Sequence, residues 1–126
     1  MSRIIDYLKL FITLIIMWGI FSSFSSYKSE WASVDKIANT NPKTAIGKIN
    51  SIEKKAISEN NYAQRIKCIA YRGKLNEEIE DSAFVDCIAE MNALCQSLND
   101  DVAKSMATYM LAKLYRNYYY SNQYLI

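Results

Sequence analysis

Apolar residues recur every three or four positions from residue 31 to residue 120, and short polar breaks interrupt this pattern. Such spacing places the apolar side chains on one face of an α-helix. No segment alternates between apolar and polar residues for long enough to form a strand. The pattern therefore predicts an all-α fold.

The polar breaks divide this region into separate helices. Residues 39–41, 59–61 and 99–100 are rich in Asn and Asp, which end or cap helices, and Pro42 suits a first helical turn. We expect residues 26–30 to be loose and residues 76–81 to form a solvated acidic turn. The expected helices span residues 31–38, 42–58, 62–75, 82–98 and 101–120.

Turns of two or three residues make sequential helices antiparallel neighbours. The expected architecture is therefore a set of antiparallel helix pairs, arranged as a short α-solenoid or a small bundle. Ile46 and Gly47 resemble part of the first helix of a tetratricopeptide repeat, and Ala63 and Ala70 resemble small positions of its second helix. The pairing is accordingly expected to be tetratricopeptide-like.

The first 25 residues have the layout of a secretory signal: a positive start, an uncharged apolar run over residues 10–21, and then several serines. A spanning helix needs about 20 apolar residues, and this run is shorter. We expect residues 1–25 to be a signal peptide cleaved after Ser25, and residues 26–126 to form the helical-repeat-like domain. The alternative is an uncleaved inner-membrane anchor through residues 10–21. Both versions predict export, to the periplasm or cell envelope.

Composition argues against catalysis, cofactors and nucleic acid. The chain has no His, 3 Gly and a net charge of +2. It therefore lacks the commonest general base and metal ligand, a glycine-rich phosphate loop and a concentrated basic face. No Cys or acidic spacing matches a zinc or calcium site. We expect a protein that is not an enzyme, with no catalytic residue, metal, cofactor or nucleic-acid partner.

The three cysteines are Cys68, Cys87 and Cys95. Cys87 and Cys95 lie eight residues apart on one expected helix, which separates them by about 12 Å, too far for a disulfide. We expect small buried apolar side chains. A disulfide from Cys68 to one of the other two, and a catalytic thiol, remain alternatives.

Tyrosines gather near the C-terminal end of the last expected helix. Three of them are consecutive and point in different directions on a helix, so they cannot all lie in a core. The structural interpretation, which comes first, is that they pack against following domains of a longer chain or cover the apolar end of this one. The functional interpretation is that they are predicted to contact a protein partner, because aromatic residues are enriched at such interfaces. Stacking on a sugar or a nucleobase is a third alternative. These residues are Tyr115, Tyr118, Tyr119, Tyr120 and Tyr124.

A series of short motifs across residues 31–126 resembles the start of the large bacterial α2-macroglobulin-family envelope proteins. The motifs are Trp31, Val34, Asp35 and Ile37; Asn41, Pro42, Lys43 and Ala45; Lys54, Lys55 and Ala56; Asn60 and Asn61; Gln64, Lys67, Ala70 and Tyr71; Ala89, Glu90 and Met91; Lys104, Ser105 and Met106; Leu111, Ala112, Leu114 and Tyr115; Tyr118, Tyr119 and Asn122.

The resemblance implies a signal peptide and an all-helical N-terminal region, followed by macroglobulin-type β-sandwich domains, in proteins of protease trapping or envelope defence. The bait region and the thioester are not implied here, because Cys95 is followed by Gln96 and Ser97 and no Cys-x-Glu-Gln stretch exists. The expected role is a non-catalytic docking or spacer module, as a fragment of a longer protein. The alternative is a free-standing, membrane-anchored helical-repeat adaptor.

Overall fold

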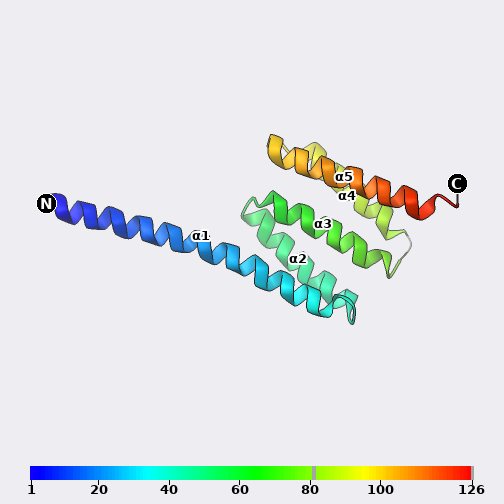
Figure 1. Cartoon of the computed structure of the whole chain (residues 1–126), viewed down its shortest axis with the longest axis horizontal. Coiled ribbons are helices and arrows are strands. Elements are labelled where there is room, and N and C mark those ends of the chain that lie inside the picture. Colours follow the sequence, from blue (N-terminus) through cyan, green and yellow to red (C-terminus); the bar gives the residue numbers. More distant parts are fainter. Residues whose placement is uncertain (81, 126) are drawn as a thin grey trace. The chain divides into compact units, whose positions relative to one another are not determined.

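A computed structural model describes residues 1–80 and 82–125, and gives the side chains of all of these except residues 18–26. Within these residues the chain forms five α-helices and no strand. The all-α class and the sequential antiparallel pairing of the helices are confirmed (Figure 1). The helices are α1 (Ser2–Ala38), α2 (Pro42–Ser58), α3 (Tyr62–Glu77), α4 (Ala83–Ser97) and α5 (Asp101–Asn122).

The chain divides into two compact units, Met1–Ser33 and Val34–Ile126. In the first unit, the large apolar side chains between Ile4 and Met17 are exposed. No helix in the described part of the chain combines the length and the apolar character that crossing a bilayer requires. The serines expected around the cleavage position, which are Ser22, Ser23, Ser25 and Ser26, lie outside the residues whose side chains are described.

Helix α1 corrects one expectation. Residues 26–30, expected to be loose, belong to a helix that continues to Ala38, so the short helix over residues 31–38 is only its last part. The physical reason is that residues 1–38 contain no Pro and a single Gly, so serines alone do not interrupt the helix. The helix ends at the expected break, where the backbone amides of Thr40 and Asn41 both donate to the Ile37 carbonyl.

The turn between α2 and α3 shows why Asn residues end helices here. Asn60 has a φ of 53°, the left-handed conformation that Asn tolerates better than most residues. Its amide donates to the Ile57 carbonyl, and the Asn61 amide donates to the Ala56 carbonyl at 2.8 Å, as in a Schellman motif. The Asn61 side chain then accepts from the Gln64 amide and caps α3.

Most other helix boundaries match the expected ones closely. Helix α2 has the expected bounds and α4 is one residue shorter at each end, whereas α3 and α5 each extend two residues further. The expected caps are confirmed: Asn41 accepts from the Thr44 amide, and Asp100 accepts from the Ala103 amide at 2.7 Å. Asp81, at the end of the expected acidic turn, lies outside the described residues.

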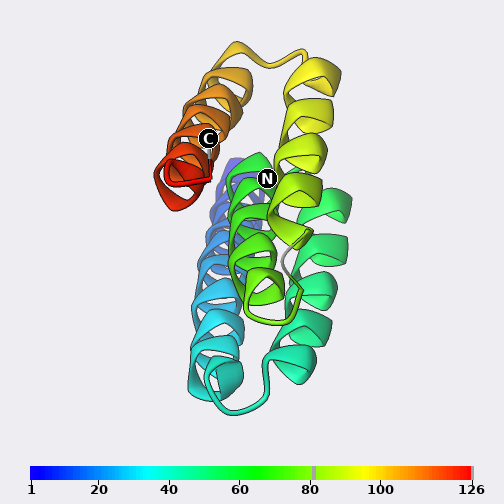
Figure 2. The ribbon, with the colours of Figure 1, turned by 90° about the vertical axis from the view of Figure 1, so that its right-hand side faces the viewer.

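In the second unit, α3 contacts α2, α4 and α5 (Figure 2). The main core joins the buried faces of α3, α4 and α5. Ile69 and Met91 are almost completely inaccessible, and the small residue Ala107 lets α5 approach closely. Helix α3 is therefore the element around which this unit is built.

The two glycines of the second unit provide a matched test of this packing. A Cβ on Gly73 would lie 2.6 Å from the Cys87 Cβ and closer still to its Sγ, whereas a Cβ on Gly47 would meet nothing within 4 Å. We expect Gly73→Ala to lower the free energy of unfolding by about 1–3 kcal/mol through overpacking. Gly47→Ala should raise it by about 0.5–1 kcal/mol, because Ala loses less backbone entropy in a helix. Urea unfolding measures both; equal effects of the two substitutions would contradict the packing.

Candidate functional site

The three cysteines are buried and free. The expectation of small buried apolar side chains is therefore confirmed, whereas the disulfide alternative is not supported. Burial, aided by the negative charge of Glu53, raises the pKa of Cys68 to about 12. Burial, aided by Glu90, raises the pKa of Cys87 to about 11. The Cys87 thiol also donates to the Ile69 carbonyl. A nucleophilic cysteine needs a lowered pKa. The pKa values of Cys68 and Cys87 are raised, which is the opposite of that requirement.

Thiol chemistry checks these shifts. Because both pKa values are raised above the ordinary 9.0, protonated thiols contribute stability that is complete below pH 9 and is lost as the pH rises toward 11 or 12. We expect native protein at pH 8 to react slowly with iodoacetamide and all three thiols to react in urea. The urea concentration at the midpoint of unfolding should decrease as the pH is raised from 9 to 11. In Cys68→Ala this decrease should be smaller. Rapid alkylation of native Cys68 or Cys87 would contradict the burial.

Arg72 is a polar side chain that contacts two other helices of the second unit. It lies on α3 and donates to Glu53 and Asn50 of α2 and to Glu90 of α4. Burial lowers the pKa of Arg72, but the hydrogen bonds and charges of the two glutamates outweigh this effect and the pKa is raised. The cluster therefore ties three consecutive helices together.

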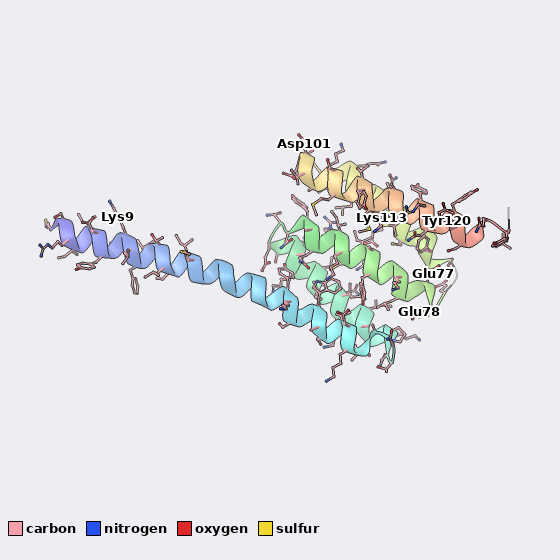
Figure 3. The ribbon with its side chains drawn as sticks, viewed as in Figure 1. Lys9, Glu77, Glu78, Asp101, Lys113 and Tyr120 are labelled. Carbon is pink, nitrogen blue, oxygen red and sulfur yellow. The ribbon has the colours of Figure 1, made fainter. Side chains whose placement is uncertain are left out.

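No group of His, Cys, Asp or Glu residues is arranged to hold a metal ion within the residues that the structure describes. Glu77 and Glu78 lie at the C-terminal end of α3, and Glu80 follows in the turn, all exposed to solvent (Figure 3). These carboxylates are a solvated turn, as expected from the charge run.

The five tyrosines predicted to contact a partner are placed differently from one another. Tyr118 stacks on Phe84 of α4, with ring centroids 6.2 Å apart and an interplanar angle of 9°. The rings of Tyr119 and Tyr120 meet edge to face, with their centroids 5.7 Å apart. Tyr115 and Tyr124 are exposed, Tyr124 to 91%. Tyr118 therefore helps to join α5 to α4, and the other four remain candidates for partner contact.

A groove that the sequence did not predict lies between α3 and α5. It has a volume of about 490 Å³, and its apolar lining includes Ile66 and Ala70 of α3 and Met106 and Met110 of α5. A second hollow of about 450 Å³ shares Ala70, Lys74 and Met110 with the first and continues toward Tyr120. Apolar residues recur every three or four positions on the facing sides of α3 and α5. The sequence, however, does not indicate that these two helices are neighbours.

No family model, curated protein or solved structure matches this chain. Its function has to be inferred from its own residues and geometry.

Proposed function

We propose that this protein is a non-catalytic interaction module whose binding surface is formed by α3 and α5. The observation that carries the proposal is that α5 exposes more large apolar residues than it buries. This helix buries three residues, Ala103, Ala107 and Leu114, although it is 22 residues long. Contiguous exposed apolar surface is typical of protein–protein contact sites. The exposed large apolar residues of α5 are Val102, Met106, Tyr109, Tyr115, Tyr118, Tyr119 and Tyr120.

The module is proposed to be a short α-solenoid with tetratricopeptide-like pairing. Two features support it: each helix from α2 to α5 contacts the next, and α3 also contacts α5, two elements further along the chain. Contacts between alternate helices are expected when helix pairs stack into an array, because each new pair covers the previous one. Arg72 supports the same arrangement by joining α2, α3 and α4.

The partner is proposed to be a protein, or the domains that follow in a longer parent chain. The second possibility rests on the resemblance to the helical N-terminal region of α2-macroglobulin-like envelope proteins, and the all-helical second unit supports it. In such a protein, the tyrosine-rich end of α5 would contact the next domain. The module itself would position or dock, without a bait region or thioester.

Photo-cross-linking in cells tests the surface directly. A photoreactive phenylalanine analogue replaces Tyr109 or Tyr120, both more than half exposed and both lining the hollows between α3 and α5. We expect discrete cross-linked protein bands from both positions, or cross-links to a following domain. The matched control is the same analogue at Lys54, an exposed residue of α2. Bands from position 54 equal to those from 109 and 120, or no bands at all, would contradict an interaction surface on α5.

A second candidate is a membrane-anchored adaptor, favoured by the continuity of α1. The expected cleavage position after Ser25 lies inside this helix, and a bond within a helix is a poor protease substrate because cleavage requires local unfolding. In this version residues 10–21 hold the exported module at the inner membrane. The chain is exported to the envelope in both versions.

The mass of the protein in envelope fractions separates the two versions. Retention of the whole chain predicts an N-terminal peptide that includes residues 1–25, and a mass near 14.5 kDa if no further domain is attached. Cleavage predicts a chain that starts at Ser26. Recovery of the protein in the cytoplasmic fraction with its N-terminus intact would contradict export.

A further inference from the structure

The groove between α3 and α5, together with the hollow that continues it, is as long as a short helix. One wall is formed by residues of α3 between Ala63 and Lys74, and the other by residues of α5 between Met106 and Met110. The hollow that continues it extends the α3 wall to Glu77. At a rise of 1.5 Å per residue, the distance along α3 from Ala63 to Glu77 is about 21 Å, which corresponds to four helical turns.

The lining of the groove is apolar and adaptable. Ala63 and Ala70 are small, so a ligand backbone can approach α3 closely. Met106 and Met110 are unbranched and flexible, and such side chains adjust to different apolar partners. A segment that presents one apolar face fits this lining, as in other helix-in-groove complexes.

The edges of the groove carry positive charge. Lys67 and Lys74 line the α3 side, and Lys113 lines the α5 side near Tyr120 (Figure 3). Lys113 lies over the ring of Tyr109, 5.7 Å from its centroid. Glu77 is the one acidic residue that lines either hollow. The charge complement of this surface is therefore an acidic partner.

The spacing of the lysines specifies the partner further. Lys67 and Lys74 are seven residues apart on α3, which separates them by about 10.5 Å along the helix axis. Carboxylates seven residues apart on a ligand helix have the same separation and lie on one face. A ligand helix with acidic residues seven positions apart beside an apolar stripe would match both the lysines and the apolar lining of the groove.

We propose that the α3–α5 groove binds an acidic amphipathic α-helix of a partner protein, about four turns long. The inference rests on the proposed function, because it names the partner of the same surface. A second copy of this chain is the weaker occupant, since α2, α3 and α5 each carry more basic than acidic residues. Helix α4 is acidic, but its apolar face lies in the core. A flat bilayer does not enter a concave groove.

Peptide binding to the full chain, held in nanodiscs of zwitterionic lipid, tests the proposal. The probe is a fluorescent 14-residue helical peptide with a leucine face and glutamates seven residues apart, and a matched peptide has lysines in place of the glutamates. Fluorescence anisotropy should show binding of the acidic peptide, weakened by added salt. Lys74→Glu combined with Lys113→Glu should weaken it at least about tenfold.

The matched control makes the same charge change outside the groove. Lys43 and Lys54 are exposed on α2 and line neither hollow, so Lys43→Glu with Lys54→Glu should change the affinity less than about twofold. Helical circular dichroism checks that both double variants fold. Equal binding of the two peptides, or equal effects of the two double variants, would overturn the proposal.

Two further outcomes would reassign the groove. Concentration-dependent self-association lost in Lys74→Glu with Lys113→Glu would assign it to a second copy. Loss of binding to phosphatidylglycerol vesicles in that variant, without any loss of peptide binding, would assign the lysines to a membrane. If the cross-links from positions 109 and 120 are observed while the acidic peptide does not bind, the acidic-helix proposal fails and the interaction module stands.

Discussion

The close approach of α3 and α4 is the constraint on which the second unit depends. Gly73 and Cys87 leave no space for an additional carbon atom between the two helices. This contact aligns the apolar stripe of α3, including Ile69, with Met91 of α4. Helix α5 then packs on both, because Ala103 and Ala107 are small where it meets them.

Polar contacts reinforce the same arrangement without adding chemistry. Arg72 projects from the central helix and reaches Glu53 on one neighbour and Glu90 on the other. Removing one partner of a partly buried ion pair destabilises a protein more than the intact pair stabilises it, because the remaining charge is left uncompensated. The Tyr71 hydroxyl donates to Asp35 at 2.7 Å, which raises the pKa of Tyr71. These contacts hold the helices in register while α5 keeps its outer face uncovered.

Local features of the sequence were enough to predict the helices from Asn41 onward. Apolar periodicity and Asn or Asp caps act over a few residues, so the caps at Asn41 and Asp100 and the break at residues 59–61 could be assigned without knowing the fold. The prediction that residues 26–30 are loose was wrong, because a run of polar residues without Pro does not end a helix. Polarity alone says little about helix termination.

The candidate site could be predicted only in part. The tyrosine cluster of α5 is visible in the sequence, but the stacking of Tyr118 on Phe84 depends on how α4 and α5 meet. The groove depends on contact between α3 and α5, which are separated by a whole helix. Periodicity within one helix carries no information about such a neighbour. Ala63 and Ala70 could be assigned to small positions of a tetratricopeptide-like helix, but their place in a groove, and that of the lysines beside them, could not be predicted before the fold was known.

Methyl NMR of the full chain tests the central claim, that α3 and α5 lie side by side and form an uncovered binding surface. With methionine and alanine methyl labels, we predict contacts between the methyl groups of Met110 and Ala70, which line one groove. Adding the acidic peptide should shift the Met106 and Met110 signals and leave buried Met91 unchanged. An absence of Met110–Ala70 contacts, or shifts confined to Met91, would contradict the account.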